Sequence, residues 1–115
     1  MGATLKILLN TMINVELTTV VYAVEAYNEE ISQEFAISGE HSSVAELREE
    51  MKERGYDKRD YDVIYQKEIF VGDIRYGIGV GRSASEARKD LDTDLALGAM
   101  TTVERIKAHP ERYIY

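Results

Sequence analysis

Three glycines at alternate positions of one apolar segment constrain the fold more than any other feature of this chain. Residues 76–81 have the sequence YGIGVG, and the helix-forming sequence SASEARKDL follows one residue later. Alternation of this kind is typical of a strand, in which successive side chains point to opposite faces of the sheet. Glycine weakens a strand interior, so a row of glycines on one face indicates that a helix, another backbone or a ligand approaches that face closely. The segment therefore predicts a strand with one bare face, followed by a helix.

This bare face is the predicted ligand or partner surface. The residues assigned to it are Arg75, Gly77, Gly79, Gly81, Arg82 and Ser83. A tightly packed helix or a β-bulge would account for the glycines structurally, and a ligand or the sheet of a second subunit would account for them functionally. Arg82 and Ser83 are placed to help hold an anion at the helix start. The spacing is not that of a phosphate-binding loop, however, and Glu86 would compete for the same amides.

Both predicted helices begin with the same capping signal. Ser43 and Ser83 each stand three residues before a glutamate, which is the pattern of a capping box. The first helix is expected to end near Gly55, since glycine adopts the left-handed conformation that closes a helix. The second is longer, with a bend or break at Gly98 and an end at Pro110.

Each helix follows two predicted strands, so the chain is interpreted as a repeated ββα unit. The return strands are expected over Ile31–Ser38 and, after a hairpin turn at Gly72, over Ile74–Gly81. Residues 20–38 align with residues 63–81 at a shift of 43, and the two helix starts align at a shift of 40. The repeats would occupy residues 15–55 and 61–108, either by duplication or because both are a hairpin followed by a helix. The predicted fold is a single α+β domain over residues 1–115. Its antiparallel sheet has four to five strands, with two helices on one face.

The charge and composition restrict the function. The chain has 115 residues, a formal net charge of −7 and no cysteine, which excludes disulfides and thiolate chemistry. An acidic chain repels a phosphate backbone, so nucleic acid is not the expected partner and a basic protein is favoured. No apolar run is long enough to span a membrane, and the first fifteen residues lack the features of a signal peptide, so a cytoplasmic location is expected.

Candidate catalytic and metal-binding groups are few. His41 and His109 form no spacing motif with an acidic residue. Asp90 and Asp94 stand four residues apart on the second helix, one turn after Glu86, and carboxylates in that arrangement suit a divalent cation. A solvated helix face is the alternative. The sequence predicts no catalytic residue, no metal site and no cofactor.

Residues 75–97, RYGIGVGRSASEARKDLDTDLAL, resemble the last strand and last helix of a double-stranded-RNA-binding domain. That resemblance implies an RNA-binding module, although Ala84, Ser85 and Glu86 occupy positions where the family has phosphate-binding lysines. The strand, glycine, serine and Glu-Ala order is also similar to HicB-type antitoxin domains, which are small sheets that bind a basic partner protein.

These features predict a non-enzymatic acidic binding or regulatory domain. We expect it to self-associate through a sheet face or edge, as a homo-oligomer, and to bind a basic protein or a small molecule. The alternative is a degenerate module of the double-stranded-RNA-binding type.

Overall fold

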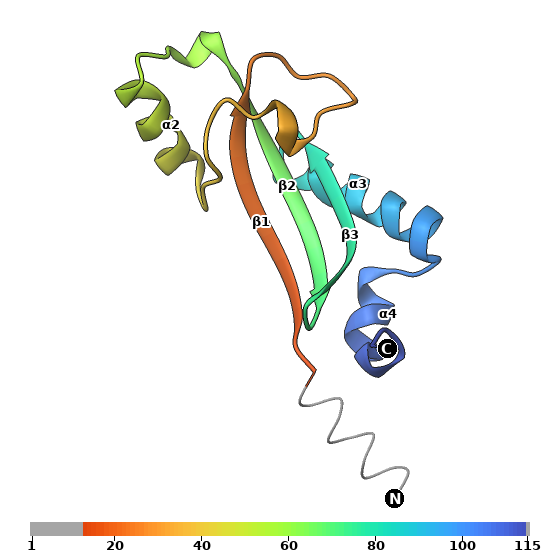
Figure 1. Ribbon diagram of the computed structural model, residues 1–115. Helices are drawn as coiled ribbons and strands as arrows, with labels where there is room; N and C mark the ends of the chain where they lie inside the picture. Colours follow the sequence, from red (N-terminus) through yellow and green to blue (C-terminus); the bar gives the residue numbers. More distant parts are fainter. Residues whose placement is uncertain (1–12, 115) are drawn as a thin grey trace, which may run out of the picture.

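The computed structural model describes residues 13–114, and it is an α+β fold built on an antiparallel sheet (Figure 1). The described sheet has three strands in the order β1-β2-β3, namely β1 (Val15–Val24), β2 (Asp62–Val71) and β3 (Ile74–Gly81). The described helices are α2 (Val44–Glu53), α3 (Ala84–Asp94) and α4 (Val103–Ala108). None of these helices is long and apolar enough to cross a membrane.

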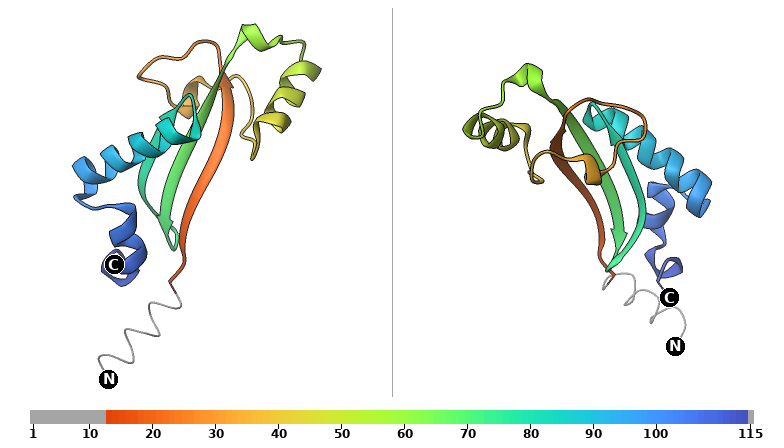
Figure 2. Two further views of the ribbon diagram at one scale, coloured as in Figure 1. Left: turned by 180° about the vertical axis from the view of Figure 1, so that it is seen from behind. Right: turned by 45° about the horizontal axis from the view of Figure 1, so that its top comes forward.

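The two faces of the sheet are covered differently. Odd-numbered residues of β1 and β2 share one face, which we call the helix face because α3 and α4 pack on it (Figure 2). Its core joins two residues of β2 to the helical segments, namely Ile69, Val71, Leu91, Leu95, Val103 and Ile106. At the other end of the helix face, Val21 and Ala23 pack against Leu47 and Met51 of α2. Even-numbered residues form the opposite face, the open face, which none of α2, α3 and α4 covers.

The connection between β1 and α2 crosses one end of the open face (Figure 1). Ile31 of this connection is buried against Tyr22, Val24 and Ile64. The sheet therefore has a second small core at this end, and the rest of its open face lies beyond the connection.

The predicted return strand between Ile31 and Ser38 is wrong. That segment instead contains the 3-10 helix η1 (Gln33–Phe35), and its one strand-like pairing with β1 is the isolated bridge between Val24 and Ala36. The reason is local: Ile31 turns into the open-face core, and Ser38 satisfies the amide of Ala23 through its side-chain oxygen at 2.9 Å. The expectation of four to five strands is therefore wrong, and the first predicted unit is a single strand, a loop and a helix.

A β-bulge in β3 overturns a second expectation. Ile69 pairs with Gly77 but Phe70 pairs with Arg75, so Tyr76 is the extra residue. A bulge shifts the alternation of side chains by one position. Gly77 therefore lies on the helix face, whereas Arg75 lies on the open face and not beside the glycines as predicted.

The helix starts confirm the two serine caps. The Ser43 hydroxyl accepts a hydrogen bond from the Glu46 amide, and the Ser83 hydroxyl accepts one from the Glu86 amide, both at 3.2 Å. The Glu86 carboxylate, however, reaches past the cap and accepts from the amide of Arg82 at 2.9 Å. The serines thus behave as predicted, and Glu86 has a role that the capping pattern did not indicate.

The predicted second helix is divided in two, which gives the fold a third described helix. After α3, a π-helical turn (Leu95–Ala99) ends at Met100, whose φ of 52° is left-handed. Thr102 then caps α4, which ends before Pro110. The break thus lies two residues beyond Gly98, the position at which the sequence predicts it.

Candidate functional site

The glycine row of β3 lies directly beneath α3. A Cβ atom at Gly79 would lie 2.7 Å from the Cα of Leu91, and closer still to the Leu91 nitrogen and the Ala87 oxygen. At Gly81 a Cβ would lie 2.6 Å from the Cβ of Glu86, and at Gly77 it would lie 2.8 Å from a methyl group of Leu95. The close approach predicted from the glycines is therefore made by a helix backbone.

This close packing lets the short carboxylates of α3 reach the backbone of β3. Asp94 accepts a hydrogen bond from the Ile78 amide at 3.0 Å, and Asp90 accepts one from the Val80 amide at 2.9 Å. Glu86 accepts from the Arg82 amide in the same way. Acidic residues four positions apart on the helix thus bond to amides two positions apart along the strand and its continuation. The spacing fits because four helical residues advance about 6 Å and two strand residues about 6.7 Å.

The acidic ladder, as we call Glu86, Asp90 and Asp94, covers the hydrogen-bond donors along the outer edge of β3. Unpaired edge donors attract strands from other chains, so their satisfaction protects the sheet. The suggestion that Asp90 and Asp94 share a metal ion is therefore not supported, because one oxygen of each is bonded to a different strand amide. Among the described residues no group of three acidic or histidine side chains is arranged to hold a metal ion.

The outer edge of β1 is covered along half of its length. Val21 exchanges two backbone hydrogen bonds with His41, at 2.8 and 2.9 Å, and the Ala23 carbonyl accepts from the Ile37 amide at 2.8 Å. The outward-facing backbone groups of Leu17 and Thr19, further down the same strand, have no hydrogen-bond partner in the described part of the chain. Within residues 13–114, this lower half of β1 is an unpaired edge of the sheet.

Glu50 of α2 fixes the segment that covers the upper half of β1. One carboxylate oxygen lies 3.1 Å from Nε2 of His41 and accepts a hydrogen bond from the Gly39 amide at 3.3 Å. The other oxygen pairs with Arg54 at 3.3 Å. The pKa of Glu50 is lowered below its ordinary value of 4.5, mainly by the hydrogen bond with His41.

A pH-dependent contribution to stability follows from this lowered pKa. A carboxyl whose folded-state pKa is depressed stabilises the fold above its unfolded pKa, and loses that contribution as the pH falls through the folded value. We expect Glu50→Gln to be less stable than the parent at pH 6, with the difference shrinking as the pH falls below 4.5. Urea denaturation of both proteins at pH 6, 4 and 3 measures this, and a pH-independent difference would contradict it.

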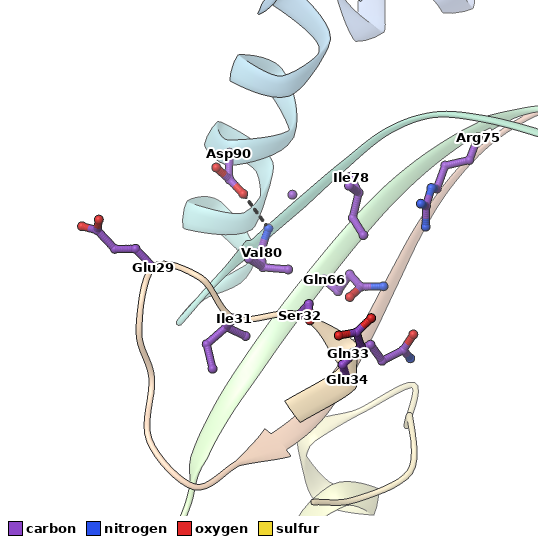
Figure 3. Close-up of a pocket in the computed structure, with 11 residues that line it drawn as sticks. Glu29, Ile31, Ser32, Gln33, Glu34, Gln66, Arg75, Ile78, Val80 and Asp90 are labelled. Atoms are coloured by element: carbon purple, nitrogen blue, oxygen red, sulfur yellow. Dashed lines mark hydrogen bonds between the residues drawn. The ribbon is translucent and has the colours of Figure 1, made fainter. Parts of the chain in front are cut away.

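A pocket of about 440 Å³ lies on the open face, between η1 and the sheet (Figure 3). Ile78 and Val80 of β3 and Gln66 of β2 form its sheet side, and Ile31 lies on the side of the connection. In Figure 3 Arg75 and Glu29 lie at opposite ends of the pocket. The pocket thus combines an apolar floor with charged groups at its rim.

A chain of hydrogen bonds runs along the sheet from this pocket. The Tyr22 hydroxyl donates to Gln66 at 3.1 Å, the Gln66 amide donates to Glu68 at 3.0 Å, and Arg75 donates to Glu68 at 3.0 Å. Gln66 is only 3% exposed, so its polar groups need these partners. Burial, followed by the charges of Glu40 and Glu68, raises the pKa of Tyr22 to about 12. Arg75 is therefore already paired with a carboxylate at the edge of the pocket.

The structure places the six predicted surface residues in four different settings. Arg75 lines the open-face pocket, and the three glycines are buried under α3. Arg82 stacks on the ring of Tyr27 at 4.6 Å, and Ser83 caps α3. Sequence reasoning missed Gln66, although a glutamine between the apolar positions of a strand is a signal of a buried polar network.

The two histidines are engaged in local contacts rather than in a catalytic arrangement. His41 contacts Glu50, and Nδ1 of His109 lies 3.6 Å from Glu111, its neighbour two residues on. Neither histidine–glutamate pair includes a nucleophilic side chain that the histidine could activate as a general base. Comparison of this chain with protein-family models, with curated protein sequences and with solved structures finds no match.

Proposed function

We propose that this chain is a non-enzymatic binding domain whose open-face pocket receives a basic side chain of a partner protein. The observation that carries the proposal is the rim of the pocket. Glu29 and Glu34 are both exposed there, and neither has a cationic partner among the described residues. The cation of the rim, Arg75, is paired with Glu68.

The shape of the pocket suits a lysine or arginine side chain. These side chains place their aliphatic stems along apolar surface and keep the charged head at the edge. Ile31, Ile78 and Val80 supply the apolar surface, and the glutamates supply the negative charge. The formal net charge of −7 would also increase the rate at which a basic partner arrives.

The other surfaces of the sheet support this choice. The helices fill the helix face around Ile69 and Val71, and the acidic ladder covers the edge of β3. The open face and the lower half of β1 are therefore the surfaces of the sheet that a partner could contact. Self-association stays a prediction, for which the backbone groups of Leu17 and Thr19 are the available edge.

Titration with short capped peptides tests the proposal. Peptides with a central lysine or arginine should shift the side-chain amide resonances of Gln66, and peptides with glutamate there should not. We expect the double variant Glu29→Gln/Glu34→Gln to bind the basic peptides about tenfold more weakly, since two rim charges together contribute about 1.4 kcal/mol.

The matched control is Glu49→Gln/Glu53→Gln, which removes the same charge from the exposed side of α2. It should bind within twofold of the parent. Free arginine or lysine that binds as well as the peptides would support the small-molecule form of the prediction. Unmoved Gln66 resonances at millimolar basic peptide, or equal weakening in the control, would contradict the proposal.

A further inference from the structure

Several cations of this acidic protein gather in one groove without a carboxylate partner. The groove consists of three adjoining hollows of about 520, 280 and 610 Å³. Arg48 and Lys58 line both of the first two hollows, and Arg82 lines both of the last two. Lys52 belongs to the first hollow. We call these four residues the basic groove; within residues 13–114 none of their charged side-chain nitrogens lies within 4.0 Å of a carboxylate oxygen.

The two arginines of the basic groove are held by aromatic groups. Arg48 donates a hydrogen bond to the Tyr61 hydroxyl at 3.4 Å, and Arg82 stacks on the Tyr27 ring. These contacts orient the guanidinium groups and leave most of their donors unbonded. A planar guanidinium with unbonded donors suits a phosphate group, which it can bind through two parallel hydrogen bonds.

The carboxylates that also line the groove are engaged with the backbone. Asp62 accepts from the Tyr27 amide at 2.8 Å, and Asp57 accepts from the Lys58 amide at 2.7 Å. Glu86 and Asp90 belong to the acidic ladder. Their negative charge remains, but their hydrogen bonds hold the fold together, whereas the side chains of the basic groove form no ion pair with a described carboxylate.

We propose that the basic groove binds a ligand that carries a run of phosphate groups. Arg48 and Arg82 would contact phosphates as oriented forks, and Lys52 and Lys58 would add mobile point charges. The phosphates could belong to a free polyphosphate or to the backbone of a nucleic acid, and both present the same chemistry. The groove shares no cation with the open-face pocket, so this inference does not depend on the proposed function.

Calorimetric titration with tripolyphosphate, and with a twelve-nucleotide single-stranded RNA, tests the inference at 50 and 200 mM salt. At 50 mM salt, Arg48→Gln/Lys58→Gln should weaken binding about tenfold or more relative to the parent. Arg105→Gln/Lys107→Gln is the control, because it removes the same charge from exposed positions on α4. It should bind within twofold of the parent, and far-ultraviolet circular dichroism verifies that both variants are folded.

The two probes distinguish the sources of phosphate. Tripolyphosphate that binds as tightly as the RNA indicates a free polyphosphate ligand, and binding of the RNA alone indicates a nucleic-acid backbone. Affinity should fall as salt rises in either case. Absence of binding by both probes at 50 mM salt, or an equal loss in the control, would overturn the inference.

Discussion

Replacing Gly79 with alanine should destabilise the fold by about 3 kcal/mol or more, because the added methyl group has no space beneath α3. Its Cβ would lie 2.7 Å from the Cα of Leu91 and closer to two further backbone atoms. Backbone atoms of a helix cannot move individually, so α3 as a whole would have to shift away from the strand. Such a shift would also remove the hydrogen bonds that Asp90 and Asp94 make with β3.

Two matched substitutions show whether the effect comes from the close approach. At Gly77 an added Cβ meets the ends of the Leu91 and Leu95 side chains, which can rotate, so Gly77→Ala should cost only about 1 kcal/mol. At Gly98 the nearest atom is 3.9 Å away, so Gly98→Ala should leave the stability unchanged or raise it slightly. Urea denaturation measures all three, and equal stability of the Gly79 and Gly98 variants would show that α3 does not rest on β3.

The second large effect should follow from removal of the acidic ladder. Asp90→Ala/Asp94→Ala leaves the amides of Val80 and Ile78 without acceptors, and we expect it to cost about 2 kcal/mol in total. The uncovered strand edge should also make the protein aggregate, because exposed edge donors pair with strands of other molecules. Urea denaturation and light scattering at rising protein concentration measure the two consequences.

The asparagine variant separates the hydrogen bond from the charge. Asp90→Asn/Asp94→Asn keeps an acceptor oxygen at each position and should remain monodisperse under conditions in which the alanine variant aggregates. An alanine variant that is as stable and as soluble as the asparagine variant would mean that the ladder does not protect the edge.

Local signals in the sequence predicted several elements correctly. The caps at Ser43 and Ser83, the turn at Gly72 and the strand that follows it all depend on neighbouring residues, and the structure has each of them. The close approach to the glycine row was also predictable, because a strand face without side chains leaves room for a closely packed neighbour. Whether a helix or a ligand approached could not be decided from the pattern.

The features that were missed depend on contacts between distant residues. The bulge at Tyr76 exists only in the pairing of β3 with β2, so the sequence placed Arg75 on the wrong face. The spacing of Ile31, Phe35 and Ile37 imitates a strand, yet Phe35 is 60% exposed and only Ile31 is buried. Strand propensity depends strongly on such tertiary context.

The candidate sites were largely beyond sequence reasoning. The open-face pocket joins Glu29 and Glu34 to Gln66 and Arg75, and these two pairs are separated by more than thirty residues of chain. The basic groove similarly brings Arg48 of α2 to Arg82 at the start of α3. Sequence analysis identified Arg75 and Arg82 but assigned them to one surface, whereas they line different hollows.

Amide hydrogen exchange at Ile78 and Val80 tests most directly whether α3 covers the edge of β3. If it does, partners cannot pair with that edge, and the open face is the binding surface of the sheet. Our account predicts that both amides exchange as slowly as amides paired within the β2–β3 ladder. It also predicts that both become fast in the folded Asp90→Ala/Asp94→Ala variant. Exchange of both amides in the parent protein at the rate of an unstructured peptide would contradict it.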